Sequence, residues 1–248
     1  MNNTSLIYGL HAATALLETH PELVRCLYLQ ANRQDERISH LLRLAERAHI
    51  PHQQKTRLEL TQLVQQAEHQ GVVVECKEQP QYSEADLPQL IEKATKPDLI
   101  LVLDGVQDPH NLGACLRSAN AFGVSLVIIP KNNSVGLTPV VRKVACGAAE
   151  ITPLIVVTNL ARTLRFLQEQ AYWLIGTAAD AKKSLGEMDF KGNVVLVMGG
   201  EADGLRHLTQ EHCDFLASIP MQGSVSSLNV SVATAVCLYE AQRQRSLA

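Results

Sequence analysis

The feature that most constrains this chain is the regular alternation of short aliphatic runs with helix-like stretches after residue 97. The runs DLILVLD, SLVIIP and NVVLVMG are rich in Val, Ile and Leu, and the segments between them space their apolar residues as helices do. Strands that are apolar throughout are typical of a parallel sheet covered by helices on both faces. Residues 98–248 are therefore predicted to form an α/β domain. Because knots are rare, this pattern alone favours an unknotted doubly wound sheet.

The first part of the chain shows a smaller pattern of the same kind. Helical spacing covers residues 9–18, 37–48 and 57–66, and strand-like runs cover residues 24–29 and 72–74. Residues 1–76 are predicted to form a small α/β domain. The following stretch, 77–97, holds three prolines and many charges, which predicts a linker that ends in a short helix over residues 87–94.

Composition excludes two ways of binding nucleic acid. The formal net charge is -3, and the chain has only 1 Trp, 5 Tyr and 4 Phe. A protein that binds RNA by bulk positive charge needs an excess of Lys and Arg. A protein that binds RNA by stacking bases on exposed rings needs more aromatic residues than this chain has. Any RNA contact is therefore expected to be local and polar.

Cysteine usage and hydropathy predict a reduced, metal-free protein of the cytoplasm. The 6 Cys are scattered without a C-x-x-C pair or a Cys/His cluster at zinc spacing. No leader-like start and no long apolar run occur, so no membrane association is expected. The histidines of the first domain are irregularly spaced and are interpreted as surface residues.

The loops that carry function are expected at the carboxyl ends of the parallel strands. These loops follow Asp104, Thr177, Met198 and Pro220. None contains the dinucleotide-binding G-x-G-x-x-G, the phosphate-binding G-x-x-x-x-G-K-[ST] or the nucleophile elbow G-x-S-x-G. The sequence therefore gives no motif evidence for a dinucleotide-binding enzyme, a P-loop nucleotide hydrolase or a serine hydrolase.

Polar residues do gather in three of these loops. Asn111 and Arg117 follow the first strand, and each has an ordinary alternative role, as a helix cap and as a solvated cation. Glu201 lies in the glycine-rich segment Met198–Gly204, where backbone can approach a ligand closely. The segment from Gly223 to Asn229 carries more hydrogen-bonding groups than one helix cap requires.

Three segments resemble the motifs of the SpoU (TrmH-like) family of RNA ribose 2′-O-methyltransferases. They are LDGVQDPHNLGACLRSANAFG, LVMGGEADGL and IPMQGSVSSLNVSVATAVCLYEA, in that order. The opening IYGLHAATALLE resembles the substrate-binding domain of one branch of the family, with a fold similar to a ribosomal protein of the L30e type. The resemblance implies a SPOUT-type parallel sheet with a deep trefoil knot over about residues 199–229, and a homodimer.

The same resemblance implies S-adenosyl-L-methionine as cofactor and assigns the site residues. Those expected to contact the methyl donor are Gly199, Ile219, Leu228, Thr177 and Met221. Those expected to act on the ribose are Arg117, Asn111, Glu201, Ser227 and Asn229. Within this set, Asn111 and Glu201 are expected to fix the Arg117 guanidinium. Arginine stays protonated at neutral pH, so Arg117 is expected to donate hydrogen bonds to the developing alkoxide rather than to act as a free base.

The branch with this N-terminal domain implies a guanosine ribose in the peptidyl-transferase P loop of 23S rRNA as the substrate. The partner is then 23S rRNA or a ribosomal assembly intermediate. Two alternatives stay open, namely the same chemistry on another rRNA or tRNA nucleotide and a non-catalytic RNA-binding assembly factor. One departure from the family pattern is Ala202, where relatives usually have glycine, and an ordinary negative φ is expected there.

Overall fold

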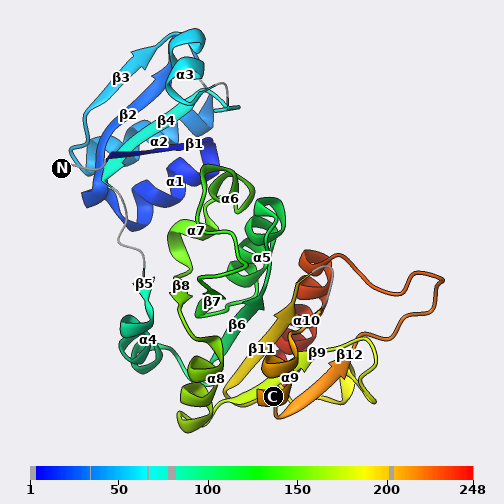
Figure 1. The fold of residues 1–248 in the computed structure, drawn as a ribbon. Coiled ribbons are helices and arrows are strands. Elements are labelled where there is room, and N and C mark those ends of the chain that lie inside the picture. The colour runs from blue at the N-terminus through cyan, green and yellow to red at the C-terminus, as the bar shows by residue number, and fades with distance from the viewer. Residues whose placement is uncertain (1–3, 34, 66, 78–81, 201–203, 248) are drawn as a thin grey trace. The chain divides into compact units, whose positions relative to one another are not determined.

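The computed structural model describes residues 4–33, 35–65, 67–77, 82–200 and 204–247. The chain divides into two compact units, each treated by itself (Figure 1). The first comprises Met1–Pro80 with Leu137–Ile151, and the second comprises Gln81–Gly136 with Thr152–Ala248. A segment from the middle of the sequence therefore belongs to the N-terminal unit.

The first unit contains a four-stranded mixed sheet in the order β1-β4-β2-β3. Its strands are β1 (Thr4–Tyr8), β2 (Val24–Gln30), β3 (His52–Lys55) and β4 (Val72–Lys77). Its helices are α1 (Leu10–Thr19), η1 (Pro21–Leu23), α2 (Glu36–Arg47), α3 (Arg57–Leu63), α6 (Pro139–Val144) and α7 (Ala148–Ile151). The three predicted helices of the N-terminal region are present within a few residues of their expected bounds. Sequence reasoning missed β1 and β3, and β3 reads HQQK with no apolar residue to mark it.

The helical spacing of TPVVRKVACGAA predicts a single helix over residues 138–149, which is wrong because the chain breaks between α6 and α7. Cys146 and Gly147 both have left-handed φ values, 51° and 91°. A Cβ at Gly147 would lie 2.7 Å from the Cβ of Ala15 and 2.9 Å from the carbonyl oxygen of His11. The break and the missing side chain let α7 pack directly on α1.

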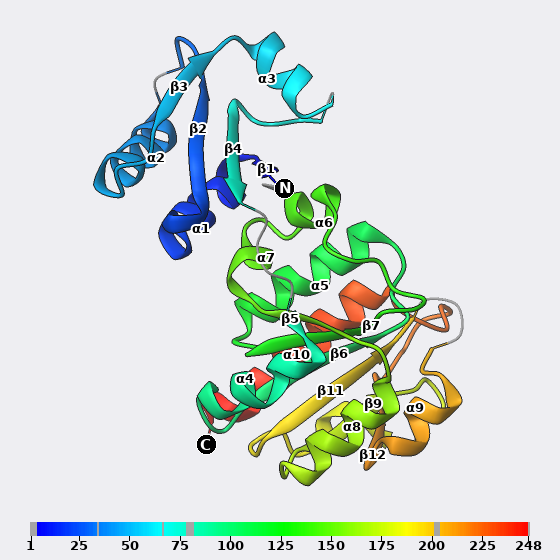
Figure 2. The same cartoon turned by 60° about the vertical axis from the view of Figure 1, so that its left-hand side comes forward.

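The second unit is built on an eight-stranded sheet in the order β10-β12-β9-β11-β6-β7-β8-β5, parallel in every pair. Figure 2 shows its central strands β11, β6 and β7 side by side. Its strands are β5 (Tyr82–Ser83), β6 (Leu99–Asp104), β7 (Leu126–Pro130), β8 (Leu154–Val157), β9 (Trp173–Thr177), β10 (Lys183–Ser184), β11 (Val194–Gly199) and β12 (Phe215–Ser218). The predicted parallel sheet is confirmed. Within the expected linker, β5 extends this sheet by pairing with β8.

Helices cover both faces of this sheet. They are η2 (Glu84–Asp86), α4 (Leu87–Lys93), α5 (Pro109–Ala121), α8 (Leu160–Glu169), η3 (Leu185–Glu187), α9 (His207–His212) and α10 (Val230–Ser246). Apolar residues of α4 and α8 form one core with alternate residues of the central strands, such as Ile100 and Val102. Helices α5 and α10 pack against each other, and α10 also contacts β11. The knot implied for residues 199–229 stays a prediction, and residues 201–203 lie outside the described chain.

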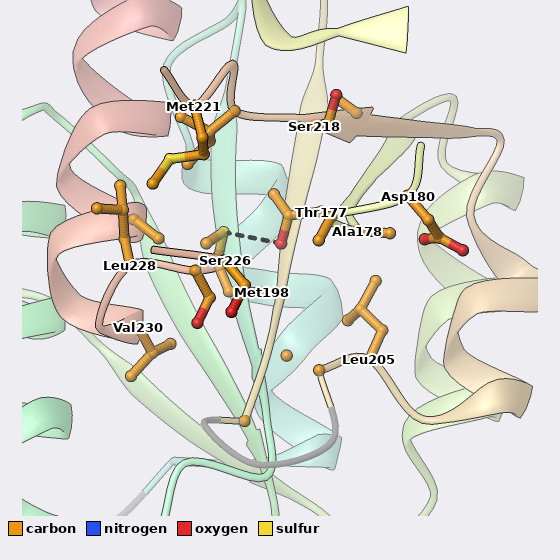
Figure 3. A pocket seen from close by; sticks show the side chains of 18 of the residues that line it. Thr177, Ala178, Asp180, Met198, Leu205, Ser218, Met221, Ser226, Leu228 and Val230 are labelled. Carbon is orange, nitrogen blue, oxygen red and sulfur yellow. Dashed lines mark hydrogen bonds between the residues drawn. The ribbon is translucent and has the colours of Figure 1, made fainter. Parts of the chain in front are cut away.

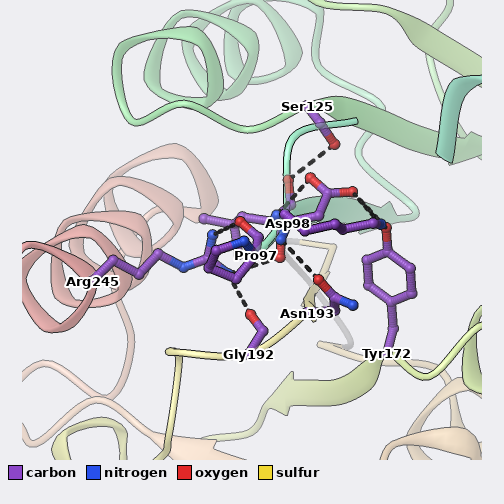
Figure 4. A network of polar contacts seen from close by, with 9 residues as sticks. Pro97, Asp98, Ser125, Tyr172, Gly192, Asn193 and Arg245 are labelled. Carbon is purple, nitrogen blue, oxygen red and sulfur yellow. Dashed lines mark hydrogen bonds and ion pairs between the residues drawn. The ribbon is translucent and has the colours of Figure 1, made fainter. Parts of the chain in front are cut away.

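A polar network fixes the carboxyl end of α10 at the amino-terminal edge of the sheet (Figure 4). The Arg245 guanidinium donates to four backbone carbonyls, those of Pro97, Asp98, Phe190 and Gly192. The Tyr172 hydroxyl donates to Oδ2 of buried Asp98 at 2.5 Å. The four bonds of Arg245 hold α10 at the edge opposite the carboxyl ends of the strands. No helix in the described part of the chain is long and apolar enough to span a membrane.

Candidate functional site

A cavity of about 750 Å³ opens at the carboxyl ends of β9, β11 and β12 (Figure 3). This volume lies within the range of about 300–1,000 Å³ that is usual for small-molecule sites. All five residues expected to contact the methyl donor line it, together with Ser227; the five are Thr177, Gly199, Ile219, Met221 and Leu228. The structure thus brings together side chains that are up to 51 residues apart, from Thr177 to Leu228.

Backbone forms one wall of this cavity, because two glycines allow close approach. A Cβ at Gly199 would lie 2.0 Å from the carbonyl carbon of Gly204, so no side chain fits at position 199. A Cβ at Gly200 would lie 2.8 Å from the carbonyl oxygen of Gly105. The amide of Gly200 donates to the carbonyl oxygen of Gly204 at 3.1 Å. The start and end of the glycine-rich loop therefore meet at the cavity through backbone alone.

An ion pair between a buried carboxylate and an arginine whose side chain is 44% exposed joins the end of this loop to the strand beside it. Asp104 ends β6, and its side chain is fully buried. Its carboxylate accepts hydrogen bonds from the backbone amide of Arg206 at 3.3 Å and from Nε of the same residue at 2.7 Å, and it also pairs with Nη2. Sequence reasoning missed this pair. The available signal was a carboxylate at the end of an otherwise apolar strand, LILVLD.

The ends of β9 and β11 beside the cavity are closely packed. The hydroxyl of Thr177 lies 3.5 Å from the carbonyl oxygen of Val197 and 3.6 Å from Sδ of Met198 (Figure 3). The absence of a side chain at Gly176 makes room for Cys213, because a Cβ at residue 176 would lie 2.7 Å from the Cys213 sulfur. Burial raises the pKa of the Cys213 thiol to about 12. That thiol therefore stays protonated at neutral pH and is a packing group rather than a nucleophile.

The chemistry of the lining differs from that of a phosphate site. Among the described lining residues the one charged side chain is the carboxylate of Asp180, and no Lys or Arg is present. Hydroxyls of Thr177, Ser226 and Ser227 alternate with the apolar side chains of residues such as Leu205. Such a cavity suits a neutral or cationic organic molecule better than a polyphosphate. In the described parts of the chain no cluster of His, Cys, Asp or Glu could hold a metal ion.

Asn111 and Asn229 meet beside the cavity. Nδ2 of Asn229 donates to Oδ1 of Asn111 at 3.1 Å. Asn229 also caps α10, since its Oδ1 accepts from the amide of Ser231 at 2.9 Å. The capping alternative for Asn111 is wrong, because Asp108 caps α5 by accepting from the amide of His110. Asn111 is instead the third residue of that helix, with 8% of its surface exposed.

The remaining predicted residues are less constrained. Arg117 is exposed on α5 and makes no hydrogen bond or ion pair with a residue that the structure describes. Glu201, expected as its partner, and Ala202, expected to have negative φ, lie outside the described residues. The expected contact between Arg117 and Glu201 therefore stays a prediction.

Comparisons with known proteins give the family of the chain and several of its relatives. The profile of the SpoU rRNA Methylase family matches residues 98–239, and a profile described as RNA 2′-O ribose methyltransferase substrate binding matches residues 6–82. The chain is 53% identical over 247 residues to the 23S rRNA (guanosine-2′-O-)-methyltransferase RlmB of Pseudomonas putida, covering 100% of this chain and 99% of that protein. It is 52% identical over 243 residues to the RlmB of Escherichia coli K12, covering 98% and 100%.

A solved structure shares the fold of the whole chain. It is that of the SpoU methyltransferase AviRb from Streptomyces viridochromogenes in complex with AdoMet, with a TM-score of 0.81. The two sequences are 24% identical, and the match covers 99% of this chain and 92% of that one. At this identity the likeness establishes the fold.

Proposed function

The chain belongs to the SpoU rRNA Methylase family, and we therefore propose that it transfers a methyl group from S-adenosyl-L-methionine to the ribose 2′-oxygen of a guanosine in 23S rRNA. The observation that carries the proposal is the cavity at the carboxyl ends of β9, β11 and β12. Its lining includes every residue that the family motifs assign to the methyl donor.

The residues present fit that donor. The cavity is large enough for a nucleoside with an amino-acid tail, and its backbone wall at Gly199 and Gly200 offers hydrogen-bonding groups without phosphate-binding cations. The donor carries a positively charged sulfonium. Among the described lining residues the one charged side chain is the carboxylate of Asp180, and a negative charge is compatible with that sulfonium. Thr177, Ile219, Met221 and Leu228 would hold it.

The bound donor supplies a methyl group already activated by its sulfonium, so the protein needs to position the ribose and stabilise the developing negative charge. Arg117 keeps its proton and donates hydrogen bonds to the 2′-oxygen as the charge develops, while a phosphate of the RNA takes the proton that the 2′-hydroxyl loses. Asn111 and Asn229 orient the ribose, and their mutual hydrogen bond keeps the starts of α5 and α10 together. Ser227 lies in the cavity lining, and its hydroxyl would help to order the ribose and the donor.

A homodimer belongs to the same proposal. Val232, Val236 and Tyr239 are 49%, 38% and 59% exposed, and their spacing puts them on one face of α10. Met221 and Val225, on the segment before the helix, are also exposed apolar residues. An apolar stripe continuous with a binding site is typical of an interface between copies of a chain. We expect the enzyme to work as a dimer in the cytoplasm, on 23S rRNA or an assembly intermediate.

The test is to map 2′-O-methyl groups in 23S rRNA from a strain that lacks the protein. We expect the methyl group of one guanosine in the peptidyl-transferase P loop to disappear, and to return with the wild-type gene but not with Arg117→Ala. Loss of a methyl group at another nucleotide would change the target and keep the chemistry. Unchanged methylation throughout rRNA and tRNA would refute the proposal.

A further inference from the structure

A second cavity, of about 470 Å³, lies in the first unit. It opens where the parallel strands β2 and β3 end and where the turn before β4 begins. Its lining includes Gln30, Arg33, Arg57, Glu68 and His69. Nearly all of the lining is polar, which distinguishes this cavity from a packing defect in the apolar core.

One wall of this cavity is rigid. His69 is 4% exposed, and its Nδ1 accepts from the amide of Gly71 at 3.0 Å. Its Nε2 therefore carries the proton and donates to the hydroxyl of Thr61 at 3.1 Å. Burial, helped by the charge of Arg57, lowers the pKa of His69, so the ring is neutral at physiological pH. The ring fixes the turn at Gln70 and Gly71, which both have positive φ.

Arg33 is held flat against that turn. Its Nε donates to Asp35 at 2.6 Å, and its Nη1 donates to the carbonyl oxygen of Gln70. A Cβ at Gly71 would lie 2.7 Å from this Nη1, so the guanidinium would have to shift if residue 71 carried a side chain. With its charge matched by Asp35, the group contributes an ordered planar surface rather than net charge.

Arg57 supplies net positive charge. Its side chain is exposed and makes no hydrogen bond or ion pair with a residue that the structure describes. Glu68, the carboxylate of the cavity, is paired with Nζ of Lys143 at 3.4 Å. The backbone N–H of Gln30 donates to the carbonyl oxygen of Gly71 at 2.9 Å, whereas its side-chain amide has no hydrogen-bonding partner among the described residues. The cavity thus combines a free cation, a free amide and a fixed guanidinium plane.

We infer that this cavity binds one nucleotide of the RNA substrate. Arg57 contacts a phosphate, Gln30 contacts a base edge, and the Arg33 plane stacks on the base. The cavity is of a size that admits a single nucleotide, and a chain with net charge -3 needs such local cationic sites to hold RNA. The inference rests on the proposed function, because it takes the methylated RNA as the ligand.

The experiment measures the affinity of the full-length protein for 23S rRNA transcribed in vitro, at several salt concentrations. We expect Arg57→Ala to weaken binding about fivefold to tenfold and to reduce the slope of log K against log salt by about one. Arg57→Lys keeps the charge and should keep most of that slope. Gln30→Ala should weaken binding without changing the slope. Arg43→Ala, which removes an exposed arginine of α2 outside the cavity, is the matched control and should stay within twofold of wild type.

Two further readouts separate this site from a general loss of structure. Titration calorimetry with S-adenosyl-L-methionine should give the wild-type affinity for every variant, and Arg57→Ala should raise KM for RNA with little change in kcat. If Arg57→Ala and Gln30→Ala bind the RNA as wild type does, while the wild type methylates it, the nucleotide site is overturned. If Arg57→Ala lowers the affinity for RNA that the wild type does not methylate, the site stands and the proposed function fails.

Discussion

Nδ2 of Asn229 donates a hydrogen bond to Oδ1 of Asn111 at 3.1 Å, across 118 positions of sequence. This bond joins the first residues of α10 to the first turn of α5, the helix that carries Arg117. One asparagine therefore caps a helix and orients a second asparagine beside the cavity. This contact holds together two of the residues that we propose act on the ribose.

The two roles of Asn229 can be separated by substitution. Asn229→Ser keeps a cap oxygen but loses the donor to Asn111, and Asn229→Ala loses both. We expect the alanine variant to be less stable than the serine variant by about 1 kcal/mol, the usual contribution of a cap. Urea unfolding measures this difference. A double-mutant cycle with Asn111→Ala should give a coupling energy of about 0.5–1.5 kcal/mol, and additive effects would show that the bond contributes nothing.

Arg117→Ala should lower the methyl-transfer rate by about 100-fold or more, because the donor to the developing alkoxide is removed. Since the side chain is exposed and has no described partner, the free energy of unfolding should change by less than about 0.5 kcal/mol. Single-turnover kinetics with 23S rRNA and thermal unfolding make the two measurements. A variant that is both folded and fully active would remove Arg117 from the mechanism.

Gly199→Ala should abolish binding of S-adenosyl-L-methionine. The new Cβ would lie 2.0 Å from the carbonyl carbon of Gly204, so the backbone wall of the cavity must move. Gly186→Ala is a suitable control, since a Cβ there would meet nothing within 4 Å. Titration calorimetry on both variants tests the prediction, which fails if both bind the methyl donor equally well.

Arg206→Ala should destabilise the protein by about 3 kcal/mol and weaken binding of the methyl donor, because it leaves the fully buried carboxylate of Asp104 without its guanidinium. The control is the pair of Arg162 and Glu84, in which the arginine side chain is 63% exposed. Arg162→Ala should cost less than about 1 kcal/mol, since exposed pairs contribute little. Urea unfolding compares the two variants, and equal losses would contradict a special role for Asp104.

Val236→Glu should convert the proposed dimer to monomers by placing a charge in the apolar stripe of α10. Light scattering coupled to gel filtration reports the mass directly. Leu58→Glu, at an exposed leucine of α3, makes the same kind of change outside the stripe and should leave the mass unchanged. A wild-type protein that is monomeric at micromolar concentration would refute the dimer.

The sequence by itself determined the class of fold and the loops that carry the site. Parallel strands buried on both faces are apolar at nearly every position, so β6, β7 and β11 were visible as runs of Val, Ile and Leu. Because such strands present their carboxyl ends at one edge, the residues after Thr177, Met198 and Pro220 were expected to meet. Strand β3 was not predictable in this way, since three of its four residues are exposed and none of the four is apolar.

Only the tertiary structure decided how those loops fit together. The contact of Asn111 with Asn229 and the pairing of Asp104 with Arg206 join residues 118 and 102 positions apart. No local pattern encodes such contacts, because they depend on how helices and strands pack. The break at Gly147 has the same origin. A sequence with helical spacing is interrupted there because Ala15 and His11 leave no room for a side chain at residue 147. Local periodicity specifies the elements, whereas steric fit between distant segments sets the geometry of the site.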